Sequence, residues 1–202
     1  MPAIGITGGV STGKSTFCNC LREILPTAGF FDADQAAHDL VDLDEVKQEL
    51  LNEFSFSVFS PSGDLNRAAL RAIVFRDAAK RQALEKILHP RIRRQWSTEA
   101  DKHRTSSEFF FADIPLLYET GGETLCDRVV VVACSPEIQL ANLMLRMGIE
   151  RDAANAMIKS QMPLEEKIKR ADHVVWNNAD QSVLADQAAK LVALWRQEKW
   201  TK

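Results

Sequence analysis

The chain has 202 residues, of which 46% are hydrophobic and 26% are charged, the balance of an ordinary globular protein with a sizeable core. Its formal net charge of −3 at pH 7 disfavours a general nucleic-acid-binding protein, because such domains usually carry a strongly basic surface. The sequence shows no N-terminal leader and no apolar run near the roughly 18 residues of a membrane span, so we expect a cytoplasmic protein without membrane or nucleic-acid partners.

Short apolar runs predict the strands of a parallel sheet. Unbroken runs of this length are typical of strands that are buried on both faces. They cover residues 3–6, 29–31, 109–112, 129–133 and 174–176. The segments between them have helical spacing, most clearly at 184–195, where Leu184, Ala188 and Trp195 share one face. This order predicts an α/β fold, a doubly wound parallel sheet with helical insertions.

A glycine-rich loop follows the first predicted strand. Residues 8–16 satisfy the pattern G-x-x-x-x-G-K-[ST], and a helical segment begins at Ser15. Such a loop lets backbone N–H groups surround a phosphate, while Lys14 adds charge and the Ser15 hydroxyl can bind Mg²⁺. The alternative is a glycine-rich turn that merely precedes Lys14, and the flanking strand and helix disfavour it. The predicted ATP-binding residues are Gly9, Val10, Ser11, Thr12, Gly13, Lys14, Ser15 and Thr16.

Acidic residues follow two of the predicted strands. Asp32 and Asp34 come after residues 29–31, at the edge of the sheet where α/β folds bind ligands. An acid there could orient an acceptor hydroxyl and accept its proton, although Asp34 could instead cap a helix that starts near Gln35. Asp113 ends the third run and is a candidate Mg²⁺ ligand through water, with helix capping again as the alternative.

Two insertions interrupt the predicted sheet. Residues 35–108 are helical in pattern, with a turn cluster at 61–64 and with Pro90 predicted to bend or end a helix near residues 84–88. Residues 136–171 are helical and rich in Arg and Lys. By analogy, small-molecule kinases use one insertion to hold the acceptor and another to close over ATP. The predicted domains are a P-loop core (1–34, 109–135 and 172–202), an acceptor domain (35–108) and a lid (136–171).

Each insertion contains a basic candidate residue. Arg146 follows an apolar run in the second insertion and could reach phosphate oxygens when the lid closes, although a surface role is the usual alternative. His89 precedes Pro90 in an apolar helical context, where a histidine is more often a core or capping residue than a catalyst.

Several sequence patterns are missing, and their absence narrows the class of nucleotide-binding protein. The sequence has no Asn-Lys-x-Asp stretch to recognise guanine, no Asp-x-x-Gly of the GTPase type and no ABC-type signature. The four cysteines lack the spacing of a zinc ligand pair, so we expect reduced thiols at Cys18, Cys20, Cys126 and Cys134. These absences favour a small-molecule kinase over a GTPase switch or a motor.

Several short segments, in their order and spacing, resemble the dephospho-CoA kinase family between residues 4 and 178. They are residues 7–16, 32–34 (DAD), 65–75, 88–90 (LHP), 115–119 (PLLYE), 135–140, Arg146, Gln161 and 171–172. The resemblance implies a P-loop sheet with an acceptor domain and a lid. It also implies transfer of the γ-phosphoryl group of ATP, with Mg²⁺, to the 3′-hydroxyl of dephospho-CoA, which yields coenzyme A.

The resemblance also implies roles for individual residues. Asp34 matches the proposed catalytic base, Arg146 matches a lid arginine that faces the phosphates, and Asn178 lies near the place where the family holds adenine. The implied acceptor-binding residues are Asp32, Asp34, Arg67, His89, Pro115 and Leu116. The chain departs from the family pattern at Asn142, Met157 and Ala179, which leaves the lid contacts and the nucleotide affinity open. The oligomeric state does not follow from the sequence.

Overall fold

The computed structural model describes residues 2–60, 62–104, 108–198 and 200. The chain divides into two compact units, of which the first comprises Met1–Asp32 with Glu99–Lys202 and the second Ala33–Thr98. The second unit overlaps the predicted acceptor insertion at 35–108, whose role stays a prediction. The predicted lid, 136–171, belongs to the first unit.

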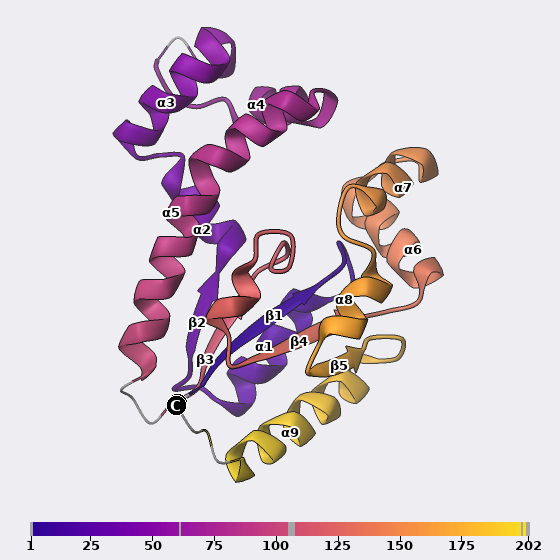
Figure 1. Ribbon diagram of the computed structural model, residues 1–202. Coiled ribbons are helices and arrows are strands. Elements are labelled where there is room, and N and C mark those ends of the chain that lie inside the picture. The colour runs from indigo at the N-terminus through magenta and orange to yellow at the C-terminus, as the bar shows by residue number, and fades with distance from the viewer. Residues whose placement is uncertain (1, 61, 105–107, 199, 201–202) are drawn as a thin grey trace. The chain divides into compact units, whose positions relative to one another are not determined.

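A five-stranded parallel sheet forms the centre of the first unit, with the strand order β2-β3-β1-β4-β5 (Figure 1). The strands are β1 (Ala3–Gly8), β2 (Gly29–Asp32), β3 (Phe110–Asp113), β4 (Arg128–Ala133) and β5 (His173–Trp176). Each overlaps one of the predicted apolar runs, and the α/β prediction is confirmed. With β1 in the middle, the loop that follows it lies at the carboxyl edge of the sheet, between neighbours on both sides.

Two helices cover one face of this sheet, α1 (Lys14–Ile24) and α9 (Gln181–Gln197). Ile6 and Val132 of the sheet, Phe17 of α1 and Trp195 of α9 belong to one buried cluster. Trp195 packs within 6.0 Å of the Phe111 ring, centroid to centroid. Burying a large apolar side chain stabilises a fold by about 1.5–3 kcal/mol, so this cluster anchors α1 and the loop before it. The predicted apolar face of residues 184–195 is therefore confirmed.

A side chain forms hydrogen bonds with the backbone of β5, which is an edge strand of the sheet. The Gln187 side chain of α9 accepts a hydrogen bond from the Trp176 N–H at 3.0 Å and donates one to the Trp176 carbonyl at 2.8 Å. An exposed strand edge presents backbone groups that can pair with other chains. Gln187 occupies both groups of Trp176 in the way that a sixth strand would.

Three helices join β4 to β5, namely α6 (Pro136–Met147), α7 (Arg151–Lys159) and α8 (Leu164–Arg170). The Ser135 hydroxyl caps α6 by accepting the Ile138 N–H, and Pro136 occupies its first turn, where a missing N–H costs nothing. Gly148, in the left-handed conformation, ends this helix. The helical character predicted for residues 136–171 follows from such local signals.

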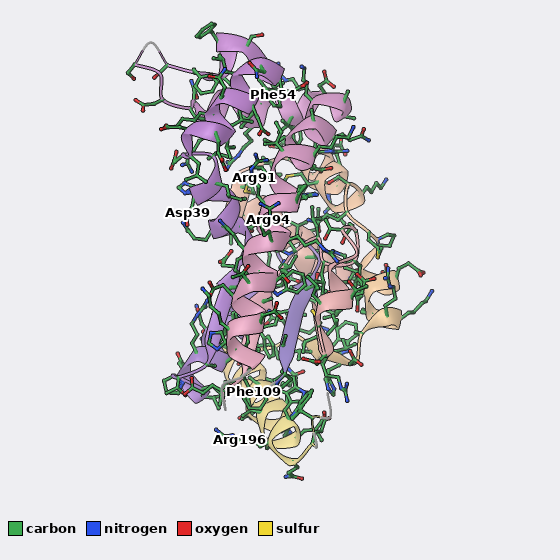
Figure 2. All side chains as sticks on the ribbon, turned by 60° about the vertical axis from the view of Figure 1, so that its left-hand side comes forward. Asp39, Phe54, Arg91, Arg94, Phe109 and Arg196 are labelled. Atoms are coloured by element: carbon green, nitrogen blue, oxygen red, sulfur yellow. The ribbon has the colours of Figure 1, made fainter. Side chains whose placement is uncertain are left out.

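The second unit is helical and has its own core. Its elements are α2 (Ala33–Leu40), α3 (Asp44–Phe54), the short 3₁₀ helix η1 (Ser55–Val58), α4 (Arg67–Arg76) and the first part of α5 (Ala78–Arg104). Val46, Leu50 and Val58 are fully buried in this core. Arg91, labelled in Figure 2, ties α5 to α3 through an ion pair with Glu49 at 2.7 Å.

Pro90 does not end its helix. α5 runs unbroken from Ala78 to Arg104 with Pro90 inside it, so of the two predicted effects, a bend or an end of the helix, the end is wrong. Proline removes one backbone donor and disturbs the preceding turn. The Arg91 guanidinium donates a hydrogen bond to the Ile87 carbonyl at 2.7 Å, which supplies a donor to that turn.

Candidate nucleotide-binding site

The loop between β1 and α1 has the conformation of an anion cradle. Ser11 and Gly13 have positive φ angles of 58° and 98°, and Gly13 is the residue that precedes α1. Where residues with left-handed and right-handed backbone conformations follow one another in a tight loop, neighbouring N–H groups point to the same side. The N-terminus of the helix adds partial positive charge. Backbone and helix together make a site for an anion such as a phosphate.

Side chains from distant segments hold the Val10 peptide groups on both sides. Gln139 of α6, only 5% exposed, donates its Nε2 to the Val10 carbonyl at 2.9 Å. Gln161, which lies between α7 and α8, accepts the Val10 N–H at 3.0 Å. Both glutamines come from the segment predicted to be the lid. This segment therefore sets the conformation of the loop at its first turn.

Asn177 holds the second half of the loop. Its Nδ2 donates to the Thr12 carbonyl at 3.1 Å, and the same atom would lie 2.1 Å from a Cβ on Gly13. Thr12 is fully buried, and its hydroxyl donates to the Gly9 carbonyl at 3.0 Å. The loop is thus held by its own side chains and by the segment after β5.

Lys14 and Ser15 are the first two residues of α1. The Lys14 ammonium donates to the Gly9 carbonyl at 3.1 Å, so the side chain bends back over the loop. Ser15 is exposed at the helix N-terminus. A cation and a hydroxyl at these positions are suited to a phosphate chain and to a divalent cation bound with it.

Two carboxylates lie beside each other at the same sheet edge. Asp32 ends β2, Asp113 ends β3, and the two residues are register partners. Asp113 also pairs with Ile6 of β1, just before the loop, and its carboxylate accepts the Cys18 thiol at 3.7 Å. The structure therefore brings Asp113 close to the base of the loop. Oxygen donors of this kind suit Mg²⁺, which binds through one or two carboxylates together with substrate phosphates.

The described residues contain no group of three or more His, Cys, Asp or Glu side chains that could hold a metal ion. A Mg²⁺ ion bound mainly by substrate oxygens and water needs no such group. The residues present, Ser15 and Asp113, therefore fit Mg²⁺ that arrives with a nucleotide.

Burial favours the protonated form of the cysteine thiols. All four are free, and Cys18, Cys20 and Cys134 are buried. Burial is the largest cause of the raised thiol pKa values, which reach about 12 for Cys126 and about 11 for Cys134. Nucleophilic cysteines have lowered pKa values, so the structure gives these thiols no catalytic part.

The remaining predicted residues of the first unit occupy different places. Arg146 is exposed in the last turn of α6, and Asn142 of the same helix donates to the Ser11 carbonyl at 3.5 Å. Asn178 accepts the Ser135 N–H at 2.8 Å, which fixes the start of α6. Pro115 follows β3, and its carbonyl accepts the fully buried Thr7 hydroxyl at 3.1 Å.

The predicted residues of the second unit also have defined places. Asp34 is in the first turn of α2, which begins at Ala33, so it is inside the helix and not before it. Arg67 begins α4, and its guanidinium bonds the Asp42 carboxylate at 2.7 Å. His89 is half-buried in α5.

Sequence reasoning assigned no role to several residues that shape the loop. Gln139, Asn177 and Lys167 contact it through backbone carbonyls. Gln139 belongs to residues 135–140, which carry the family resemblance, but nothing in the local sequence distinguishes Asn177 or Lys167 from ordinary loop or helix-surface residues. Gln161 and the Glu119 side chain belong to segments that carry the family resemblance, which was the only signal available for them.

The fold and the cradle define a P-loop nucleotide-binding protein. The family model for dephospho-CoA kinase matches residues 2–182. A dephospho-CoA kinase of Symbiobacterium thermophilum is 39% identical over 198 residues, which cover 97% of this chain and 81% of that protein. The chain therefore belongs to the dephospho-CoA kinase family, and it is an ATP-using kinase of the P-loop fold.

Solved structures agree with this assignment. A Thermus thermophilus protein of known crystal structure matches with a TM-score of 0.80 and 33% identity, over 98% of each chain. The dephospho-CoA kinase of Campylobacter jejuni matches with a TM-score of 0.66 and 28% identity, over 96% of each chain. Separately, none of the helices in the described part of the chain has the length and apolar character of a membrane span.

Proposed function

We propose that this protein transfers the γ-phosphoryl group of ATP to the 3′-hydroxyl of dephospho-CoA and so forms coenzyme A. The supporting observation is a cradle whose backbone is held by hydrogen bonds from Gln139, Gln161 and Asn177, in a chain that belongs to this kinase family. Phosphoryl transfer needs little covalent help from the protein, and a pre-organised electrostatic site supplies most of the catalysis.

The proposed roles follow the chemistry of each side chain. The acceptor oxygen bonds to the γ-phosphorus as the bond from phosphorus to the β–γ bridging oxygen breaks, and ADP leaves. Asp34 takes the proton of the acceptor hydroxyl. Lys14 and the N–H groups of the loop stabilise charge on the phosphate oxygens, and Arg146 adds a guanidinium from α6.

Ser15 and Asp113 would hold Mg²⁺, which supplies further positive charge to the phosphates when it is bound. Asp32, Arg67, His89, Pro115 and Leu116 are proposed to bind the acceptor, and Asn178 is proposed to contact adenine. The chain's partners in this proposal are small molecules, ATP and dephospho-CoA.

A substrate panel tests the proposal. Purified protein is assayed for ADP release with ATP, Mg²⁺ and one acceptor at a time: dephospho-CoA, pantetheine, adenosine, AMP or CMP. Rapid release with dephospho-CoA and slow release with the others is expected. Comparable turnover with AMP or CMP would instead indicate a nucleoside monophosphate kinase, and ATP binding without turnover would indicate a nucleotide sensor.

A further inference from the structure

Lys167 of α8 is fully buried, although its side chain carries a charge. Its Nζ donates to the Pro115 carbonyl at 2.8 Å and to the Gly8 carbonyl at 3.3 Å, and it forms an ion pair with Glu119 at 2.8 Å. An ammonium group has three donors, and here three acceptors surround it. The three acceptors come from two segments, Gly8 and residues 115–119, so the ammonium of α8 joins three segments of the chain.

Burying a lysine in this way is costly, because the charge loses its hydration. Burial lowers the pKa of Lys167, while the hydrogen bond that Lys167 donates to Glu119 and the charge of that carboxylate act in the opposite direction. A buried methionine would fill a similar space without this cost. A cation in such a place is thus a candidate for a role beyond packing.

The contacts of Lys167 converge on the point where β1 becomes the nucleotide-binding loop. Gly8 is the last residue of β1, and Pro115 lies just after β3. The Thr7 hydroxyl donates to the same Pro115 carbonyl at 3.1 Å. Glu119 also accepts the Met162 N–H at 3.0 Å, close to Gln161, which binds Val10. One buried cation therefore joins the base of the loop to the segment that holds its first turn.

We propose that Lys167 is a positioning residue for nucleotide binding, which fixes the start of the loop by holding the Gly8 and Pro115 carbonyls together. The inference rests on the proposed use of this loop for ATP. In this role the fully buried Lys167 acts through the backbone carbonyls that it holds. A displacement of about 1 Å in a binding site can cost on the order of 100-fold in activity, so a small shift at Gly8 matters.

The test separates this role from general stabilisation. Lys167→Met leaves Glu119 without its cation, which by itself destabilises the fold. The double variant Lys167→Met/Glu119→Gln removes both charges, and its glutamine keeps an oxygen that can accept the Met162 N–H. Lys169→Met is the matched control, because Lys169 is on the same helix, is 69% exposed and pairs with Glu166 on the surface.

The readouts are the melting temperature, the dissociation constant for ATP without acceptor, and the two KM values. We expect the double variant to recover much of the melting temperature that Lys167→Met loses. Its Kd and KM for ATP should still rise about tenfold or more, while its KM for dephospho-CoA at saturating ATP stays within about twofold of wild type. Lys169→Met should match the wild type in every readout.

A folded double variant that binds ATP within about twofold of wild type would overturn the proposal, as would a change confined to the KM for dephospho-CoA.

If the double variant does not fold, Thr7→Val decides, because it removes the second donor to the Pro115 carbonyl and leaves the Lys167 ion pair intact. A weakening of ATP binding by about threefold or more supports the proposal that the position of the Pro115 carbonyl affects the loop, and an unchanged Kd for ATP overturns it. If the wild type fails to phosphorylate dephospho-CoA, the proposed function is wrong, yet the ATP dissociation constants still test Lys167.

Discussion

Asn177 lies directly beside Gly13. Its Nδ2 stands 2.1 Å from the position that a Cβ on Gly13 would take, and Gly13 has a φ of 98°, in the region that side chains disfavour. Two independent constraints thus require glycine at this point of the loop. The first is the left-handed backbone, and the second is the amide that holds the Thr12 carbonyl.

Gly13→Ala should therefore abolish tight ATP binding and lower the stability of the fold. A strained backbone costs roughly 1–3 kcal/mol, and the clash must in addition displace Asn177 from Thr12. Gly148→Ala is the control, because Gly148 also has a positive φ, of 61°, but no atom within 4 Å of its Cβ position. The melting temperature should fall in both variants, and the ATP dissociation constant should rise only for Gly13→Ala. Equal ATP binding by the two variants would contradict this account.

Lys14→Met tests the charge of the cradle. Removing a well-placed electrostatic stabiliser costs on the order of 100- to 1,000-fold in rate, and we expect a loss of kcat in this range with dephospho-CoA. Lys190→Met, on the exposed surface of α9, is the control for a lysine loss in general. A Lys14→Met variant that retains most of the wild-type turnover would mean that the loop is not the catalytic phosphate site.

The features that the sequence predicted are those that depend on neighbours along the chain. The strand at Ala3–Gly8, the loop up to Gly13 and the buried face of α9 all follow from local patterns of apolar residues and glycines. Pro90 shows the limit of this reasoning. Its local effect is to break a helix, yet α5 continues through it, and the Arg91 guanidinium donates to the Ile87 carbonyl in the preceding turn.

The features that the sequence did not predict depend on contacts between distant residues. Lys167 bonds the Gly8 carbonyl across 159 positions, and Asn177 bonds the Thr12 carbonyl across 165. Neither side chain carries a local signal, because lysine and asparagine are common on helix and loop surfaces. A backbone carbonyl also accepts from any donor that the fold brings near, so the pairing appears only once the fold is known.

The buried thiols give a prediction about alkaline pH. The pKa of Cys134 rises from 9.0 to about 11 and that of Cys126 to about 12, chiefly because burial disfavours the thiolate. Between pH 9 and 11 the folded state therefore binds more protons than the unfolded state, and the free energy of unfolding must fall as the pH rises. Below pH 9 this contribution is constant.

Denaturant titrations between pH 8 and 11 measure this effect. The double variant Cys126→Ser/Cys134→Ser should show a weaker decline over that range than the wild type. A thiol reagent at pH 8 should label the native protein slowly and the unfolded protein at once. Rapid labelling of native Cys126 or Cys134 would contradict the burial and the raised pKa values.

Asp34→Asn separates a catalytic role from a structural one. Asp34 is in the first turn of α2, where a negative charge interacts favourably with the helix dipole, so its loss should cost only about 0.3–1 kcal/mol of stability. The asparagine can still bond an acceptor hydroxyl, but it cannot take the proton. General-base catalysis contributes typically 100- to 10,000-fold, and phosphoryl transfer has a loose transition state that needs modest activation of the nucleophile. We therefore expect kcat to fall by about 100- to 1,000-fold, with the Kd for ATP unchanged because Lys14 and Ser15 are intact.

Asp39→Asn is the matched control, because Asp39 is an exposed carboxylate on the same helix. Turnover of Asp34→Asn within about twofold of wild type would exclude Asp34 as the base and leave it only its small effect on helix stability, and the base would then be sought at Asp32 or Asp113.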